Sequence, residues 1–265
     1  MTETSDRLDI SRPHPARVYD FLLGGKDNFE SDRAFAEQMI AAYPEAKEAA
    51  LANRAFMRRA VAWMAHEAGI RQFIDLGTGL PTSPNLHEVV QGIAADSRVV
   101  YVDNDPLVLA HARALLVGTP EGATAYVDAD VRDPVRILAG ADEVLDLSRP
   151  VGLTSIALLH YVTDADDAYA IMAGLMAALP SGSCLAITHG THDLVSADRR
   201  ERMERLWAAS PVASQVRDRS EVERFFAGLG LVEPGVVPIT EWHPDEDDRA
   251  GFADMAFYGG LAIKP

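Results

Sequence analysis

The stretch Phe73-Ile74-Asp75-Leu76-Gly77-Thr78-Gly79 decides the fold of this chain. An apolar run that ends in an acid and two closely spaced glycines is typical of a buried strand entering a tight turn. A second apolar run, Val99-Val100-Tyr101-Val102, ends at Asp103 about 20 residues further on, the spacing at which nucleotide-binding α/β folds place a ribose-binding acid. Glycines without a Cβ let the backbone approach a ligand closely. The two segments together predict a nucleoside-binding site.

Strands and helices alternate on both sides of this turn, as in a Rossmann-like, doubly wound α/β fold with a mostly parallel sheet. The predicted strands are Gln72–Leu76, Arg98–Val102, Thr124–Asp128, Val151–Leu159, Cys184–His189, Val232–Ile239 and Met255–Ile263. The predicted helices between them are Asn85–Ala94, Pro106–Leu116, Val135–Leu138, Asp166–Leu179 and a last one from Ser220 through Phe226.

The N-terminal quarter of the chain does not follow this alternation. A polar arm precedes three predicted helices, at Ala16–Leu23, Ser31–Ala42 and Ala46–Ala68. We therefore divide the chain into an N-terminal arm and helical lid segment, residues 1–69, and an α/β domain, residues 70–265.

Composition limits the partners of the protein. A net charge of -16, with no run rich in Lys or Arg, is unfavourable for binding nucleic acid. The single cysteine, Cys184, excludes an intramolecular disulfide and a cysteine-based zinc cluster. No apolar run approaches the ~20 residues of a membrane helix. We expect a cytoplasmic protein that binds a small molecule and neither nucleic acid nor membrane; its oligomeric state is not predicted.

The residues after the glycine turn distinguish between nucleotide cofactors. The dinucleotide fingerprint requires a third glycine where Thr82 stands, and Pro81 and Pro84 interrupt the turn. These differences disfavour a pyrophosphate bound at a helix N-terminus. The acid at Asp75 would repel a diphosphate, whereas it can hold the ammonium group of a cationic sulfonium amino-acid cofactor.

A third acid is predicted at the same edge of the sheet. Asp130 follows the strand Thr124–Asp128 and could accept a hydrogen bond from the exocyclic amine of adenine, while the neighbouring amide of Val131 donates to the ring. Acids at the ends of three successive strands predict a cofactor site more specifically than the glycine turn alone.

Residues 70–265 resemble a class I S-adenosylmethionine-dependent methyltransferase through Asp75–Gly79, Val102-Asp103 and Asp130. The whole chain is similar to a bacterial S-adenosyl methyltransferase family formerly described as a domain of unknown function. The stretches that carry this likeness are Arg12–Asp20, Leu23–Phe29, Gly77–Thr82 and Tyr101–Pro106. The resemblance implies methyltransferase activity, S-adenosylmethionine as cofactor, and a seven-stranded sheet with an antiparallel last strand. Leu80–Pro84 departs from the class, in which the first helix begins sooner, and the acceptor is not implied.

Two groups of residues are predicted to contact the cofactor. In the α/β domain they are Asp75, Gly77, Thr78, Gly79, Asp103, Asn104, Asp130 and Val131, and in the N-terminal segment they are Tyr19, Gly24, Gly25 and Asn28. The N-terminal group is included because aromatic residues flank its polar residues, as expected of a segment that folds over a pocket. We expect this segment to cover the cofactor and border the acceptor site.

Methyl transfer from a sulfonium needs no protein nucleophile, and a general base helps only when the acceptor must lose a proton. His160 is a candidate base and Tyr161 a candidate wall of the acceptor pocket, although a histidine packed for structural reasons is the alternative. His189 and His192 form an isolated His-x-x-His without an evident third ligand, so we expect no metal. Trp207 is expected in the core or at an interface.

Two other functions are compatible with a nucleoside site. The protein could bind S-adenosylmethionine for regulation without transferring methyl, because the catalytic residues are weakly marked. It could also be an NAD-dependent oxidoreductase on a similar sheet, which the missing third glycine disfavours.

Overall fold

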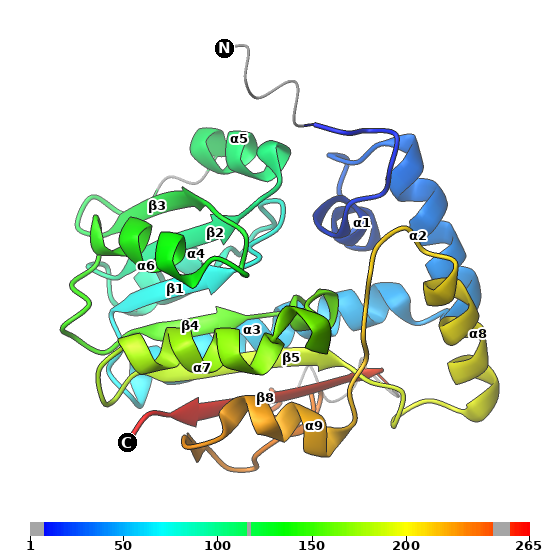
Figure 1. Cartoon of the computed structure of the whole chain (residues 1–265). Helices are drawn as coiled ribbons and strands as arrows, with labels where there is room; N and C mark the ends of the chain where they lie inside the picture. Colours follow the sequence, from blue (N-terminus) through cyan, green and yellow to red (C-terminus); the bar gives the residue numbers. More distant parts are fainter. Residues whose placement is uncertain (1–7, 116–117, 246–254) are drawn as a thin grey trace.

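The computed structural model describes residues 8–115, 118–245 and 255–265. Its sheet is built mainly from parallel strands in the order β3-β2-β1-β4-β5-β8-β6, with β7 also paired to β8 (Figure 1). The strands are β1 (Gln72–Leu76), β2 (Arg98–Asp103), β3 (Ala123–Asp128), β4 (Gly152–Ser155), β5 (Cys184–Gly190), β6 (Gly230–Leu231), β7 (Val237–Pro238) and β8 (Phe257–Ile263). The strand order reverses between β1 and β4, where doubly wound sheets bind their ligands.

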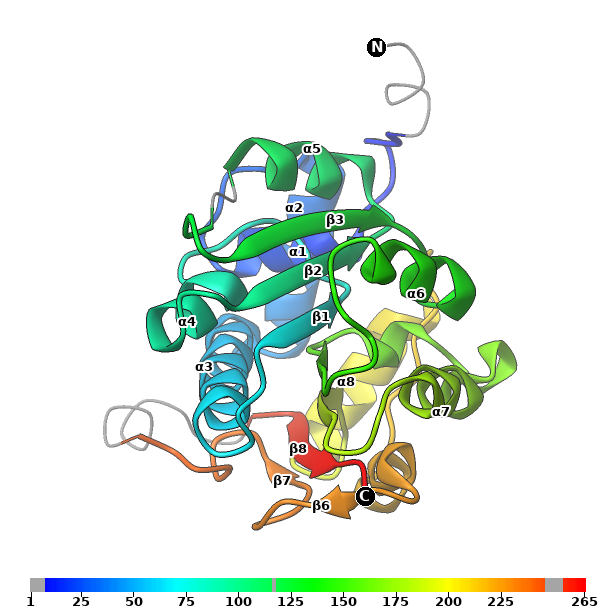
Figure 2. The same cartoon turned by 90° about the vertical axis from the view of Figure 1, so that its left-hand side faces the viewer.

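The far edge of the sheet differs from the prediction in one respect. β8 runs antiparallel to β5, as expected, but the single strand predicted at Val232–Ile239 is replaced by two short strands, β6 and β7, which both pair with β8 (Figure 2). Pro234 lacks an N–H for the ladder and Gly235 adopts a φ of 86°, so the chain turns between the two strands. The described part of the sheet therefore has eight strands.

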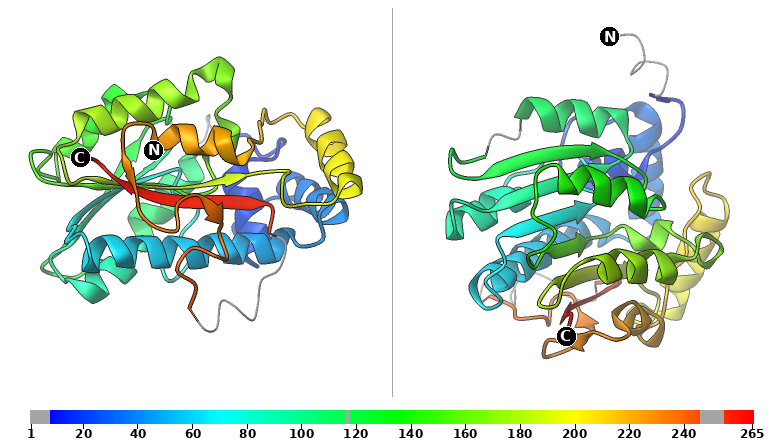
Figure 3. Two further views of the ribbon diagram at one scale, coloured as in Figure 1. Left: turned by 90° about the horizontal axis from the view of Figure 1, so that it is seen from below. Right: turned by 60° about the vertical axis from the view of Figure 1, so that its left-hand side comes forward.

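Helices cover both faces of the sheet (Figure 3). On one face lie α3 (Ala46–His66) and α4 (Leu86–Ile93), on the other α6 (Pro134–Asp142), α7 (Ala168–Ala178) and α9 (Arg219–Glu223), while α5 (Pro106–Leu115) contacts β3. Side chains alternate between the faces, so that Phe73 joins the core under α3 while Ile74 joins the core under α7. Because α3 helps form that core, it is part of the sheet's packing rather than of a separate lid.

A helical cap lies beyond the carboxyl ends of the parallel strands. It consists of α1 (Pro15–Leu22), α2 (Glu30–Ala42) and α8 (Ala197–Ala208), with α1 and α8 both in contact with α2 (Figure 1). The helix α8 was not predicted, because most of its residues are charged and only Met203 among them is buried. Its N-cap, Ser196, accepts a hydrogen bond from the backbone N–H of Arg199.

Three predicted boundaries change. The strand predicted at Val151–Leu159 ends at Ser155, because Ala157 takes a left-handed φ of 54° and Leu159–Tyr161 then forms a 3₁₀ turn, η1. The helix predicted at Val135–Leu138 extends over Pro134–Asp142, and α9 is capped by Asp218 rather than Ser220. None of the helices in the described ranges is long and apolar enough to span a membrane.

Candidate functional site

One cavity of about 350 Å³ lies between the carboxyl ends of the strands and the helical cap. It brings together predicted site residues from five separate stretches of the chain. Those that line it are Tyr19, Asp75, Gly77, Thr78, Gly79, Asp103, Asn104, Asp130, Val131, His160 and Tyr161.

The glycine turn after β1 requires glycine at two positions. Gly77 and Gly79 have φ values of 65° and 68°, a conformation that residues with a Cβ rarely adopt. A Cβ on Gly77 would lie 2.6 Å from Cδ1 of Leu158. The turn therefore keeps its backbone exposed to the cavity, and a larger residue at position 77 would displace the chain that leads to η1.

Asp103 is held in place through both of its carboxylate oxygens. The backbone N–H of Gly79 donates to Oδ2 and the backbone N–H of Asp105 donates to Oδ1, each at 2.9 Å. Burial raises the pKa of this carboxyl group. Each oxygen can accept a second hydrogen bond. The carboxylate is thus oriented to receive a pair of hydroxyl groups from the cavity.

Asp75 is a buried acid close to the positive charge of Arg54. Its Oδ1 accepts a hydrogen bond of 2.6 Å from the hydroxyl of Thr154. Burial raises the pKa of Asp75 to about 6, although this bond and the Arg54 charge act in the opposite direction. Arg54, on α3, also lines the cavity and donates to the carbonyls of Thr82 and Pro84 at 2.7 and 2.6 Å. The two charges suit the ammonium and carboxylate of an amino acid.

Asp130 is shared with neighbouring side chains. Asn104 donates to its Oδ2 at 2.8 Å, and Arg132 lies 3.1 Å from its Oδ1 while also pairing with Asp166 at 3.0 Å. Any ligand amine that binds Asp130 therefore joins an existing network, which holds the loop after β3 in position.

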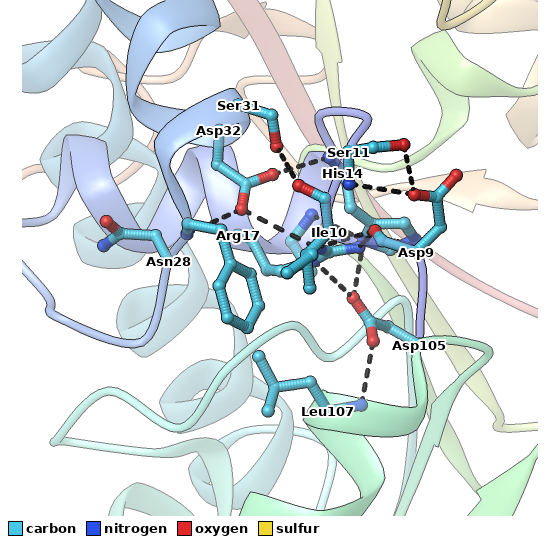
Figure 4. Close-up of polar contacts among 12 residues, drawn as sticks. Asp9, Ile10, Ser11, His14, Arg17, Asn28, Ser31, Asp32, Asp105 and Leu107 are labelled. Carbon is cyan, nitrogen blue, oxygen red and sulfur yellow. Dashed lines mark hydrogen bonds and ion pairs between the residues drawn. The ribbon is translucent and has the colours of Figure 1, made fainter. Parts of the chain in front are cut away.

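Ion pairs and hydrogen bonds link the N-terminal segment to the loop after β2 (Figure 4). Nδ1 of His14 and Nε of Arg17 lie 3.0 and 3.1 Å from Oδ2 of Asp105, and Arg17 also lies 3.7 Å from Asp32. Asp32 accepts the backbone N–H groups of His14 and Phe29, each at 2.9 Å. This network links α1 and α2 to the residue that also orients Asp103.

Gly24, Gly25 and Asn28, which the sequence predicts to contact the cofactor, are not among the described residues that line the cavity. The amide of Asn28 instead donates to Asp20 at 2.8 Å and to the carbonyl of Gly25 at 3.1 Å. A Cβ on Gly25 would lie 2.0 Å from Oδ1 of Asp20. These residues shape the connection from α1 to α2.

His160 and Tyr161 lie on η1 and face the cavity. Burial, with the nearby His189 and Arg217, lowers the pKa of His160 to about 3, so the ring is neutral at physiological pH. Within the described residues its Nδ1 has no hydrogen-bond partner. Burial also raises the pKa of Tyr161.

Arg217 holds η1 in place through hydrogen bonds to its backbone and an ion pair beside it. Its guanidinium donates to the carbonyls of Leu159 and Val162, at 3.2 and 3.1 Å, and pairs with Asp164 at 2.7 Å. It also lies 2.8 Å from Nε2 of His189, whose Nδ1 lies 2.8 Å from the carbonyl of Gly190. Both nitrogens of His189 are thus engaged, which makes it a structural residue rather than a metal ligand.

A metal site is also not evident elsewhere. His192 lies 3.6 Å from Glu204, and the described ranges contain no group of three His, Cys, Asp or Glu residues that could hold an ion. Trp207, which the sequence places in the core or at an interface, lines the cavity.

Comparison with known proteins identifies the chain. Residues 1–265 match the sequence profile of a family described as S-adenosyl methyltransferase. The chain belongs to this family. As a member of the S-adenosyl methyltransferase family, the chain is an enzyme that uses S-adenosylmethionine. Family membership favours this function over the regulatory and NAD-dependent alternatives.

Two solved structures closely resemble this methyltransferase. A DUF574 family protein from Streptomyces avermitilis is 49% identical, with a TM-score of 0.93, and the match covers 97% of this chain and 99% of that chain. A candidate methyltransferase from Thermobifida fusca is 41% identical, with a TM-score of 0.87 and coverage of 97% and 96%. No curated protein sequence matches significantly.

The polar groups that line the cavity of the methyltransferase are complementary to those of S-adenosylmethionine. Asp103 presents an oriented carboxylate for ribose hydroxyls, and Asp75 and Arg54 present opposite charges for the two ends of an amino acid. Arg54 had no signal in the sequence, because it lies on a helix that precedes the α/β alternation and reaches the site only through folding.

Proposed function

We propose that this methyltransferase transfers the methyl group of S-adenosylmethionine to a small molecule that shares the cavity with it. The observation that carries the proposal is the continuity of the cavity, which extends from Asp103 at the end of β2 to Trp207 on α8. One end has the charges that suit the cofactor, and the other is bounded by cap helices. A small acceptor, rather than nucleic acid, also agrees with the net charge of -16.

Each end of the cofactor has a proposed partner in the chain. Asp103 would accept the ribose hydroxyls, Asp75 the ammonium group, and Arg54 would donate to the carboxylate. For the adenine ring, the proposed partners are Asp130 and the backbone of Val131. Tyr19 also lines the cavity, and its hydroxyl donates to the carbonyl of Ala50 at 3.0 Å.

The bound cofactor supplies an electrophilic methyl group and a neutral thioether leaving group. The chain contributes by aligning the acceptor and by excluding water. Water is excluded by the cap helices and by the N-terminal segment, which the ion pair between Arg17 and Asp105 holds over the strand ends. His160 is proposed to take the acceptor's proton when that acceptor is a hydroxyl group. Its neutral imidazole can accept a hydrogen bond, unlike an imidazolium.

The cellular setting is part of the same proposal. We propose a bacterial cytoplasmic enzyme. The bacterial origin of the two solved relatives supports this, as does the single cysteine, which is buried and has no second cysteine in the chain with which to form a disulfide.

Calorimetric titration with S-adenosylhomocysteine tests the cofactor site. The wild type should bind it, and Asp103→Ala should weaken binding at least about tenfold, because the ribose loses hydrogen bonds to a charged acceptor. Asp146→Ala, which removes an acid from the far end of the sheet, is the matched control and should bind normally. Equal binding by Asp103→Ala and the wild type would exclude the proposed ribose contact. Release of S-adenosylhomocysteine in an acceptor screen then tests methyl transfer itself.

A further inference from the structure

The half of the cavity away from the strand-end acids is nearly devoid of charge. We define this distal half by six lining residues from α2, α8, the following loop and β8: Met39, Met203, Leu206, Trp207, Val212 and Phe257. The charged residues among the described lining belong to the N-terminal arm, α3, β1, β2 and the loop after β3. An ionised group in the distal half would therefore lose its hydration without gaining a counter-charge.

Aromatic rings form one side of this distal half. The ring of His160 lies 5.8 Å from that of Phe257 and 4.3 Å from that of Tyr161, whose ring lies 6.1 Å from that of Trp207. All four residues line the cavity. Flat aromatic faces and edges at these separations suit another ring, which can stack on them or meet them edge to face.

Two buried polar atoms in the cavity wall lack a partner among the described residues. They are Nδ1 of His160 and Oδ1 of Asn53, whose residues are 8% and 0% exposed. The amide nitrogen of Asn53 already donates to the carbonyl of Ala49 at 3.0 Å, which leaves its oxygen as an acceptor. A ligand that brings a hydrogen-bond donor to this wall adds no further acceptor beside these atoms, whereas a carboxylate would.

We propose that the methyl acceptor is an uncharged aromatic molecule that carries a hydroxyl group, seated against the rings of the distal half with the hydroxyl donating to His160. This inference rests on the proposed function. The low pKa of His160, caused by burial and by the nearby Arg217 and His189, agrees with it, because the same surroundings disfavour a cationic ligand.

The transfer step conserves charge within the cavity. A lone pair of the acceptor oxygen forms the new bond to the methyl carbon, and the electrons of the broken carbon–sulfur bond stay on sulfur. The hydroxyl proton passes to the imidazole of His160, which later releases it to water. Positive charge thus leaves the sulfonium as it arrives on His160, so the buried ring gains a proton only as the neighbouring charge disappears.

Binding of three naphthalene probes to protein saturated with S-adenosylhomocysteine tests the acceptor class without relying on turnover. We expect 2-naphthol to bind at least about tenfold more tightly than 2-naphthoate and 2-naphthylmethylammonium by calorimetry. Tighter or equal binding of either charged probe would overturn the proposal. So would failure of 2-naphthol to bind a protein that does bind S-adenosylhomocysteine, and that result would leave the proposed function intact.

Two variants locate the probe. Trp207→Leu should weaken 2-naphthol about tenfold while S-adenosylhomocysteine binds normally; Trp63→Leu, on α3 and outside the described lining, is the matched control. His160→Phe should reduce the preference for 2-naphthol over 2-methylnaphthalene while leaving the latter's affinity within about threefold. If Trp207→Leu binds 2-naphthol as tightly as the wild type does, or if His160→Phe keeps the wild-type preference for 2-naphthol, the assignment is wrong. Circular dichroism melting verifies that each variant is folded.

Discussion

Nε of Arg17 lies 3.1 Å from Oδ2 of Asp105, and the two side chains are only 4% and 1% exposed. This ion pair joins the first helix of the chain to the loop that follows β2. The backbone N–H of Asp105 also donates to Asp103 at 2.9 Å. The position of the N-terminal segment and the orientation of Asp103, the proposed ribose-binding acid, therefore both depend on Asp105.

Replacing Arg17 should affect both stability and cofactor binding. Arg17→Gln leaves Asp105 and Asp32 as buried acids without their main cation, a change that costs about 3–5 kcal/mol in comparable sites. Urea unfolding measures the loss, and titration with S-adenosylhomocysteine should show weaker binding. Arg12→Gln removes an exposed arginine from the same arm and should change neither quantity. Unfolding of Arg17→Gln at the wild-type urea concentration would contradict this role.

Cofactor affinity should depend on pH through Asp75. The folded-state pKa of Asp75 is raised to about 6, so its carboxylate becomes protonated as the pH falls through that value. The proposed partner of the cofactor's ammonium group is then lost. The dissociation constant of S-adenosylhomocysteine should rise by up to about tenfold per pH unit below pH 6. Calorimetry between pH 5 and 8 measures this dependence. Asp75→Asn should bind weakly at all these values, and a wild-type profile that is flat would contradict the contact.

Alanine at position 77 should disrupt the site, whereas alanine at position 92 should not. Gly77→Ala places a Cβ 2.6 Å from Leu158 and forces a left-handed conformation on alanine. Gly92 lies in the exposed part of α4 with no atom near its added Cβ, so Gly92→Ala should stabilise the protein by about 0.5–1 kcal/mol. Thermal unfolding compares the two variants. A higher melting temperature for Gly77→Ala than for the wild type would be incompatible with the turn described.

Buried histidines should make the protein sensitive to acid. Burial lowers the pKa of His189 to about 4 and that of His160 to about 3, both below the ordinary value of 6.5. The unfolded chain therefore binds protons that the folded chain does not, and stability falls as the pH drops from about 6.5 toward 4. Each histidine should cost about 2 kcal/mol between pH 7 and 5, partly offset by Asp75, whose raised pKa acts oppositely. Urea unfolding at both pH values checks the decrease, and His189→Gln should reduce it; an increase in stability at pH 5 would contradict the assignment.

The fold could be predicted because its signals are local. Apolar runs ending in Asp75 and Asp103 mark buried parallel strands, and the topology of such sheets brings those ends together. The strand predicted at Val151–Leu159 was too long because the left-handed Ala157 gives no signal in an apolar run. The edge strands β6 and β7 were merged because pairing with β8 depends on contacts distant in sequence.

The site was harder to predict, because several of its walls come from outside the strand ends. Arg54 sits on a helix that also packs against the sheet, and Trp207 sits on a highly charged helix with one fully buried residue. Gly24, Gly25 and Asn28 were assigned to the cofactor from their unusual composition. Composition alone does not distinguish a loop that binds a ligand from one that satisfies its own hydrogen bonds, as Asn28 does with Asp20.

The packing of α2 against α8 has a consequence for biosynthesis. The ring centroids of Phe35 and Trp207 lie 5.6 Å apart, although the two residues are far apart in the sequence. Phe35 therefore leaves the ribosome long before Trp207 is made. A nascent chain arrested before α8 would expose to solvent the surface of α2 that α8 covers. The helix α2 is thus synthesised well before the helix that covers it.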